Sequence, residues 1–233
     1  MKRFYKTVDV READGGWQVA LDGRPMKTVG AAQQVVSSEA LARALAQEWD
    51  EQGEDIDPAR FVFRDMADYA IDVIAADPDA IADKLVAFGD TDTLLYRADP
   101  DEPLYARQQT EWEPLVGAFE RREDIELVRV SGIMHRPQHE ASMAKLRARL
   151  AGLDAFTLAG MDALTSLSAS LVVALSTLDA ESEEQALILW RAASLEEDWQ
   201  AEQWGRDEEA EERRARRQAD YLKASEFVRA ARA

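Results

Sequence analysis

Residues 163–178 form a run without a charged side chain, in a chain of which 32% of the residues are charged. A helix that is apolar on nearly every side has to be enclosed by other parts of the fold. A bilayer span needs about 20 apolar residues, so this run is too short for one. We therefore predict that residues 156–178 form the central buried helix of a multi-helical domain.

Amphipathic segments flank this run on both sides in the sequence. Their apolar residues recur every three or four positions, and Pro or Gly ends several of them, which is the pattern of surface helices packed on a core. Nearly the whole chain after residue 60 is therefore predicted to be helical. The expected helices span 66–77, 81–89, 104–122 and 138–150, with a short β-like stretch at 125–130.

The first 60 residues carry a different pattern. Segments that alternate polar and apolar residues are bounded by Asp-Gly pairs at 14–15 and 22–23, a typical signal of β-hairpins. A helix is predicted over 39–52, because a capping Ser precedes it and its apolar residues fall on one face. The fold class is thus α+β and mostly α: a small α+β domain at 1–60, then a helical domain at 61–233 that ends in a charged tail helix.

The charge of the chain limits its partners. The formal net charge is −18, which disfavours nucleic acid and anionic membrane surfaces. The absence of Cys excludes disulfides, thiolate metal sites and Cys nucleophiles. The N-terminal residues contain no apolar signal core, so we expect a cytoplasmic protein without membrane insertion. We also expect it to be a monomer.

The charged tail, residues 207–233, is interpreted as a solvated or loosely attached helix. Its pairs Glu209 with Arg213 and Glu212 with Arg216 place an acid four residues before a base, the favourable order on a helix surface. One hypothesis is that this tail is the binding element of a scaffold protein with an unrelated partner.

The segment 195–205 combines two Trp and four acids. If the preceding helix continues through it, Trp190, Glu197 and Trp204 share one face. Such a helix can pack within its own domain, with the acids solvated at its edges. It can also pack on one side and present carboxylates and Trp side chains to a partner on the other. The residues alone favour packing within the domain and leave the second interpretation open.

Two sets of residues suggest metal-dependent hydrolase or phosphatase chemistry as an alternative function. His135 and His139 have a metal-binding spacing, but Pro137 between them breaks the helix that this spacing needs. Asp90 and Asp92 are similar to an aspartyl-phosphate motif, but a parallel sheet that would present the nucleophile is not predicted. A surface loop followed by a helix start is the better interpretation of the His pair, and capping and turn formation explain the Asp pair. No cofactor and no metal are expected.

Short motifs in a specific order carry a resemblance that extends over about residues 3–205. The chain resembles the assembly chaperones of the F-type ATP synthase catalytic head, specifically the member that handles the alpha subunit. The motifs are Arg3-Phe4-Tyr5-Lys6, Leu21-Asp22-Gly23-Arg24-Pro25, Lys27-Thr28, Ala46-Gln47-Glu48-Trp49-Asp50 with Gln52, Asp90-Thr91-Asp92-Thr93-Leu94-Leu95-Tyr96-Arg97, Gln109, Trp112-Glu113-Pro114-Leu115, Ser168-Ala169-Ser170-Leu171-Val172, Leu195-Glu196-Glu197 with Gln200, and Trp204-Gly205.

The resemblance implies a small β-rich domain followed by a larger helical one. It also implies a non-catalytic function, in which the protein holds the unassembled alpha subunit until that subunit pairs with beta. The tail from Asp207 does not match the family well, and Met26 replaces a small aliphatic residue. Eukaryotic members are mitochondrial, whereas this chain looks bacterial, which agrees with a cytoplasmic location.

The resemblance also implies which residues bind the partner. Glu196 aligns with a functionally important acid of the family, and Glu197 is the second choice. Trp190 and Trp204 are expected to be core residues that fix the helix, so that Glu196 and Gln200 face a groove. The motif residues with an expected structural role are Trp49, Asp92, Arg97, Trp112 and Trp204.

Overall fold

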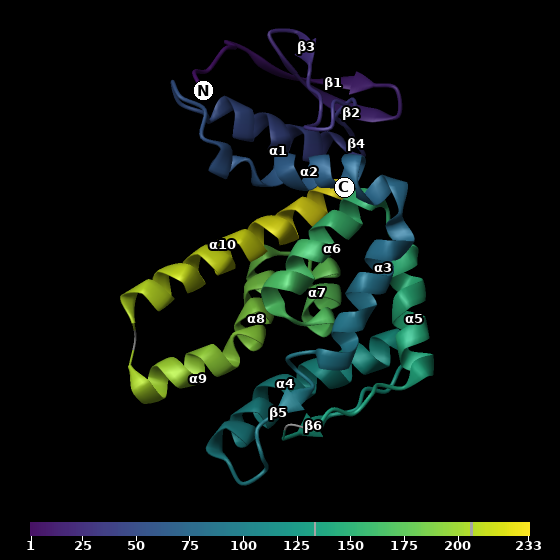
Figure 1. Cartoon of the computed structure of the whole chain (residues 1–233), viewed down its shortest axis with the longest axis vertical. Helices are drawn as coiled ribbons and strands as arrows, with labels where there is room; N and C mark the ends of the chain where they lie inside the picture. The colour runs from purple at the N-terminus through teal and green to yellow at the C-terminus, as the bar shows by residue number, and fades with distance from the viewer. Residues whose placement is uncertain (133, 206) are drawn as a thin grey trace. The chain divides into compact units, whose positions relative to one another are not determined.

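The computed structural model describes residues 1–132, 134–205 and 207–233 (Figure 1). The chain forms two compact units. The first unit consists of residues 1–78, 153–160 and 223–233, and the second of 79–152 and 161–222. Most of the described residues are helical, and the first unit contains a small antiparallel sheet, so the predicted α+β, mostly α class is confirmed. The expected division into domains at residue 60 stays a prediction.

The sheet of the first unit is built around its second strand. That strand pairs antiparallel with the other three, and the sheet has the order β1-β2-β3 with β4 also on β2. Both predicted Asp-Gly turns are present, and Asp22 and Gly23 have φ values of 47° and 75°, as a two-residue turn of the primed type requires. The strands are β1 (Val8–Ala13), β2 (Gly16–Leu21), β3 (Arg24–Pro25) and β4 (Val35–Val36).

Helix α1 (Glu39–Asp50) covers β1 and β2 with its apolar face. The Ser38 hydroxyl caps it by accepting a hydrogen bond from Leu41 N at 3.0 Å, as the sequence pattern predicts. Its stripe of Leu41, Leu45 and Trp49 is buried. The Trp49 carbonyl accepts a 2.5 Å hydrogen bond from the Tyr5 hydroxyl, which ties the start of the chain to the end of the helix. Helix α2 (Val62–Asp72) follows and packs on α1.

The last residues of the chain belong to the core of the first unit. Phe227 in α10 (Glu208–Ala231) is 0% exposed, and its ring lies 5.7 Å from that of Phe63. The carbonyl groups at the end of α10 accept hydrogen bonds from the Ser37 and Ser38 hydroxyls. Gly160 permits a close approach, because a Cβ there would lie 2.3 Å from Val228 Cγ2. The expectation of a loosely attached tail is therefore wrong for this part of the helix.

The second unit consists of helices with one small parallel pair of strands. The predicted β-like stretch at 125–130 contributes only Val130 to that pair, which joins β5 to β6. Its elements are α3 (Pro78–Ala87), β5 (Tyr96–Arg97), α4 (Pro103–Glu123), β6 (Val130–Ser131), α5 (Glu140–Ala151), α6 (Ala155–Ser168), α7 (Leu171–Leu178), α8 (Glu183–Ala193) and α9 (Leu195–Trp204), where α3 and α6 each begin in the first unit.

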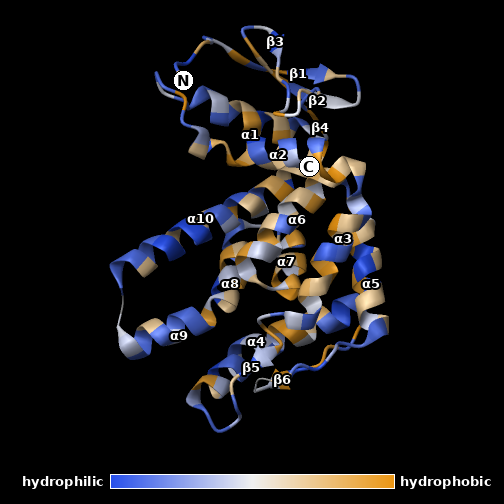
Figure 2. Cartoon of the chain, in the orientation of Figure 1, coloured by the Kyte–Doolittle hydropathy of each residue, from blue (hydrophilic) through white to orange (hydrophobic). Residues whose placement is uncertain are grey.

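The uncharged run forms two helices and not the single one that its composition predicts. Helix α6 ends at Ser168, Ala169 adopts a left-handed conformation with φ 49°, and Ser170 caps the start of α7. Nearly every residue of α7 is buried, so the prediction of a buried apolar centre holds. Figure 2 shows the apolar residues gathered on α6 and α7, whereas α9 and the start of α10 are largely hydrophilic. Across the described ranges, no helix has the length and apolarity that a membrane crossing requires.

Asp92 holds the break between α6 and α7. Its side chain is fully buried and accepts hydrogen bonds from Ser170 Oγ at 2.7 Å, Val172 N at 2.9 Å and Leu94 N at 3.0 Å. A carboxylate at a helix N-terminus is favoured by the helix dipole and by the free backbone N–H groups. Burial nevertheless dominates and raises the pKa of Asp92 to about 6, although these donors act in the opposite direction.

Replacing Asp92 by Asn is expected to change how stability depends on pH. The folded-state pKa of about 6 lies above the ordinary Asp value of 3.8, so the wild-type carboxyl stabilises the fold most below pH 4 and loses that contribution as pH rises through 6. At about 1.4 kcal/mol per pKa unit, the wild type should lose about 3 kcal/mol relative to Asp92→Asn between pH 3 and 7. Urea unfolding of both proteins across this range measures the difference, and a difference that does not vary with pH contradicts the assignment.

Truncation of Phe227 tests whether the end of α10 is core. Phe227→Ala should lower the free energy of unfolding by about 3–5 kcal/mol, because it leaves a cavity beside Phe63. Glu209→Ala is the control, since Glu209 lies on the same helix and forms an exposed ion pair with Arg213; it should change stability by less than about 0.5 kcal/mol. If the two substitutions lower the free energy of unfolding equally in a urea titration, the end of α10 is not a core segment and the interpretation as a loosely attached tail is correct.

Candidate functional site

The predicted continuous helix through residues 190–204 is interrupted at Ser194. This residue is buried and ends α8 with φ −92° and ψ 5°, and α9 begins directly after it. The change of direction separates the Trp residues that a straight helix would align. Trp190 is 1% exposed and is a core residue, as expected. Trp204 is 81% exposed, so its assignment to the core is wrong.

Trp204 is exposed because α9 ends with it. Gly205 follows with φ 92°, a conformation that favours Gly, and α10 begins at Glu208. Figure 1 shows α9 and α10 running in roughly opposite directions. The Trp204 side chain therefore lies at the end of the helix, where the described residues leave it open to solvent.

Two acids of α9 contact α4. Glu196 Oε1 accepts a hydrogen bond from Gln108 Nε2 at 2.7 Å. One helical turn and a half further on, Glu202 forms an ion pair with Arg107 at 2.7 Å. The Arg107 guanidinium also lies 5.9 Å from the ring of Trp199. Neighbouring residues of α4 thus hold α9 at two points along its length.

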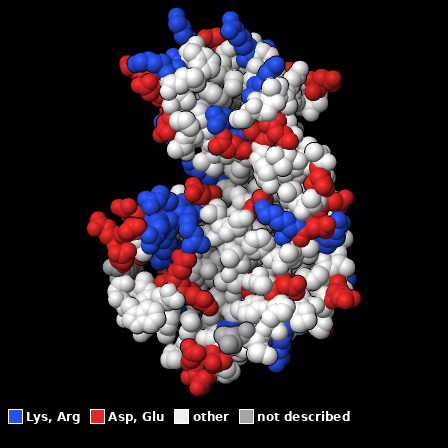
Figure 3. All heavy atoms as spheres, viewed as in Figure 1, with Lys and Arg blue, Asp and Glu red and all other residues white. Residues whose placement is uncertain are grey.

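The other two acids of α9 contact α10. Glu197 pairs with Arg217 at 2.7 Å, and Asp198 pairs with Arg214. Arg217 also donates to the Leu167 carbonyl at 2.9 Å, which satisfies an oxygen at the end of α6. Figure 3 shows the cations of α10 as a dense group bordered by acidic side chains. Helix α9 is therefore fixed on both sides by charged or polar contacts.

A groove of about 520 Å³ lies between α9 and α10. Glu197, Gln200 and Trp204 line it from α9, and arginines line it from α10. Glu196 does not line it. The three residues predicted to bind a partner therefore lie on two sides of α9: Glu197 and Gln200 at the groove, and Glu196 toward α4. Their role in partner binding stays a prediction.

The environment of Glu196 differs from that of its neighbours. Burial raises the pKa of the Glu196 carboxyl, and the hydrogen bond from Gln108 acts against this rise. Gln108 is fully buried, and its Oε1 accepts the Ala98 N–H at 2.9 Å. Within the described part of the chain, Glu196 Oε2 has no hydrogen-bond partner and no cation pairs with this carboxyl.

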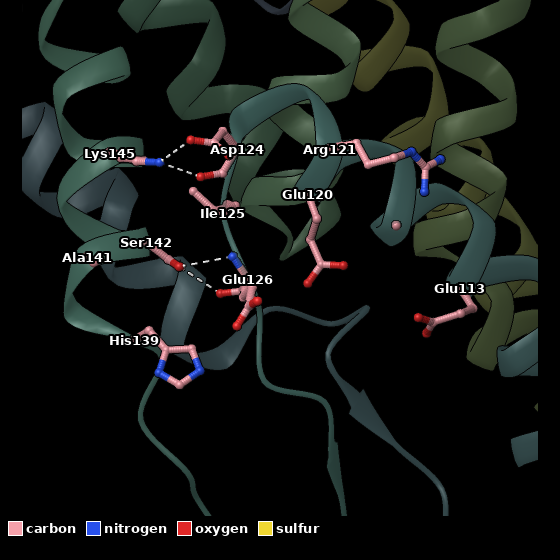
Figure 4. Close-up of a pocket in the computed structure, with 11 residues that line it drawn as sticks. Glu113, Glu120, Arg121, Asp124, Ile125, Glu126, His139, Ala141, Ser142 and Lys145 are labelled. Atoms are coloured by element: carbon pink, nitrogen blue, oxygen red, sulfur yellow. Dashed lines mark hydrogen bonds and ion pairs between the residues drawn. The ribbon is translucent and has the colours of Figure 1, made fainter.

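A larger hollow of about 950 Å³ lies beside α4 and α5 (Figure 4). Three of the four acids that line it form ion pairs: Glu113 and Glu120 both pair with Arg129, and Asp124 pairs with Lys145 at 2.6 Å. Burial acts to raise the pKa of Glu113, but its arginine partners outweigh burial and lower it. A nucleophile activated by a neighbouring base is not found among the side chains drawn there.

The residues proposed for hydrolase chemistry make structural contacts. Asp92 caps α7, and Asp90 Oδ1 accepts the Gln138 N–H at 3.1 Å. The His135 ring contacts the Tyr96 hydroxyl at 2.8 Å, and His139 precedes the first turn of α5. Outside positions 133 and 206, no three acidic, His or Cys side chains converge as a metal site would require. The geometry therefore favours the capping interpretation.

The remaining motif residues lie in the cores of their units. Trp49 packs between Tyr5 and Phe61 in the first unit. In the second unit, the Trp112 indole donates to the Ala192 carbonyl at 2.7 Å and so joins α4 to α8. Arg97 is buried and pairs with Glu113 at 2.8 Å. These contacts agree with a structural role.

Sequence reasoning missed the residues that hold α9. Gln108 and Arg107 are 88 and 95 positions away from their partners in α9, and no local pattern connects them. Arg214 and Arg217 are three residues apart and therefore share a face of α10. That spacing was visible in the sequence, but it does not indicate which acids the arginines contact.

The two Trp residues of the helix pair provide a direct test of the site geometry. Trp190→Ala should destabilise the protein by about 3–5 kcal/mol, because it empties a buried position. Trp204→Ala should change stability by less than about 0.5 kcal/mol, because the removed ring is in water. Urea unfolding measures both values, and a large loss in Trp204→Ala would contradict its exposed position.

The family model described as ATP12 chaperone protein matches residues 2–120. Atp12 from Paracoccus denitrificans has a crystal structure that is similar to this fold: the TM-score is 0.90 at 36% identity, over 99% of this chain and 98% of that one. A point mutant of that protein gives the same score and identity. The Atu1473 protein of Agrobacterium tumefaciens has a TM-score of 0.90 at 37% identity, over 97% of this chain and 84% of that one. On this evidence, the chain belongs to the ATP12 chaperone protein family.

Proposed function

We propose that this protein is a non-catalytic assembly chaperone that binds the unassembled alpha subunit of the F-type ATP synthase head. Membership of the ATP12 chaperone family is the observation that carries the proposal. It is supported by the structural contacts of Asp90, Asp92 and His135, which leave these residues without the arrangement of a catalytic site. The expected cytoplasmic location and monomeric state stay predictions.

The client in this proposal needs protection of an apolar surface. A free alpha subunit exposes the surface that beta covers in the assembled head, and such surfaces aggregate when they are left open. Trp204 provides an apolar side chain that can contact this apolar client surface, since its ring is exposed at the edge of the groove between α9 and α10. Large aromatic side chains at interfaces contribute much of the binding energy.

Polar and acidic side chains elsewhere on α9 add specificity. Glu196, Glu197 and Gln200 lie on α9, and the whole chain carries a net charge of −18. Such a surface attracts basic groups at the rim of a client patch and accelerates their encounter. Release requires no chemistry, because beta competes for the same client surface. The proposed binding face is therefore α9 with the open end of its groove.

Charge reversal on α9 tests the function and the site together. Glu196→Lys should lower the affinity for purified alpha subunit at least about 10-fold, because it replaces an attraction by a repulsion at the interface. The measurements are co-elution and suppression of alpha-subunit aggregation by light scattering. Glu12→Lys is the matched control, since it makes the same charge change on an exposed position of β1.

Folding of the variant is checked by circular dichroism. If Glu196→Lys is unfolded, Glu196→Gln replaces it, because it removes the charge with little change in shape. If a folded variant binds the alpha subunit as well as wild type does, Glu196 is not part of the binding site. A wild-type protein that neither co-elutes with the alpha subunit nor suppresses its aggregation overturns the proposed function.

A further inference from the structure

We propose that Gln108 is a positioning residue that holds Glu196 ready to accept a basic side chain, arginine or lysine, from the client. This inference rests on the proposed function, which it deepens by naming the chemistry of the contact. The hydrogen bond between Gln108 Nε2 and Glu196 Oε1 is 2.7 Å long and joins α4 to α9.

Glu196 is distinguished from the other acids of its helix by its partner. Glu197, Asp198 and Glu202 each form an ion pair with an arginine of α10 or α4. Among the residues that the structure describes, Glu196 is bound only by the neutral amide of Gln108. Its negative charge is therefore the one on α9 that is not already matched within the protein.

An unmatched, half-buried carboxylate is unfavourable for stability. A carboxylate that is already paired with an arginine attracts a cation of a partner only weakly, because the arginine largely neutralises its charge. A carboxylate held by a neutral donor keeps its full charge and has a defined orientation. Glu196 Oε2 lacks a hydrogen-bond partner within the described residues and can accept a charge-assisted hydrogen bond from a guanidinium or ammonium group.

The orientation of the Gln108 amide is fixed by its other contact. The Ala98 N–H can only donate, so the atom that it contacts at 2.9 Å is the amide oxygen. The amide nitrogen must then point to Glu196 as a donor. Gln108 is fully buried, so water does not compete for either contact. The backbone of residue 98 thereby determines which group faces Glu196.

The neighbouring side chains do not substitute for this contact. Arg107 precedes Gln108 on α4, but its guanidinium is held by Glu111 at 3.0 Å and by Glu202 at 2.7 Å. Because these two acids hold Arg107, it does not pair with Glu196, and Gln108 is the residue of α4 that contacts the Glu196 carboxylate. A basic group of the client would therefore meet a carboxylate that is aligned but not neutralised.

Two substitutions of Gln108 separate positioning from packing. Gln108→Met preserves the approximate shape and removes both hydrogen bonds. Gln108→Glu keeps an oxygen for the Ala98 N–H but presents a second carboxyl oxygen to Glu196. Both should weaken alpha-subunit binding at least about 10-fold, and Glu196→Gln should have an effect of the same size. Gln109→Met is the control on the adjacent, half-buried position of α4 and should bind like wild type.

A double substitution tests whether Gln108 acts through Glu196. Gln108→Met combined with Glu196→Gln should bind as weakly as Glu196→Gln alone, because residues that act through one contact are not additive. Losses that multiply would show that Gln108 affects binding by another route and would overturn the proposal. Wild-type affinity in a folded Gln108→Glu variant would also overturn the proposal. This variant retains the contact with the Ala98 N–H, so it decides the question if Gln108→Met proves unstable.

A signal from the free protein separates this inference from the proposed function. In the NMR spectrum of labelled protein, the side-chain amide protons of Gln108 should shift in Glu196→Gln and stay unchanged in Glu197→Gln. An amide that does not respond to Glu196→Gln overturns the positioning role, whether or not the alpha subunit binds. If the amide responds but wild type does not bind the alpha subunit, the proposed function fails, and the inference about a client cation fails with it.

Discussion

The buried carboxylate of Asp92 is the interaction on which the architecture of the second unit depends. It accepts hydrogen bonds from Ser170 Oγ and Val172 N at the start of α7 and from Leu94 N in its own loop. These contacts stabilise the left-handed conformation of Ala169, which divides the uncharged run into two helices.

The elements that local chemistry determines could be predicted. The Asp-Gly turns, the capped helix α1 and the buried apolar run all depend on residues close in sequence, and all are present. The break at Ala169 could not be predicted, because it depends on the contact of Ser170 with Asp92, which is 78 positions away in the sequence. The end of α10 was misjudged for another reason: its many charges hid the helical spacing of Phe227, Val228 and Ala231, which are buried.

The candidate site shows the same limit. Composition indicated that residues 195–205 were unusual, and the family resemblance directed attention to Glu196. Only the structure shows that Glu197 and Asp198 contact arginines of α10 whereas Glu196 meets the amide of Gln108. Three of the four acids of α9 are therefore neutralised by arginines. The fourth, Glu196, is held by a neutral amide and has no counter-ion among the described residues. This difference in pairing arises from residues on two other helices, which no pattern within α9 could reveal.

The first unit is assembled from segments that lie far apart in the sequence, because residues 223–233 supply part of its core. During synthesis the ribosome makes residues 1–78 long before it adds Phe227 and Val228. The first unit therefore cannot complete its core until the residues of the second unit have also been made. A shortened product that lacks the final turns of α10 would leave the surface around Phe63 uncovered, and exposed apolar surfaces of this kind aggregate.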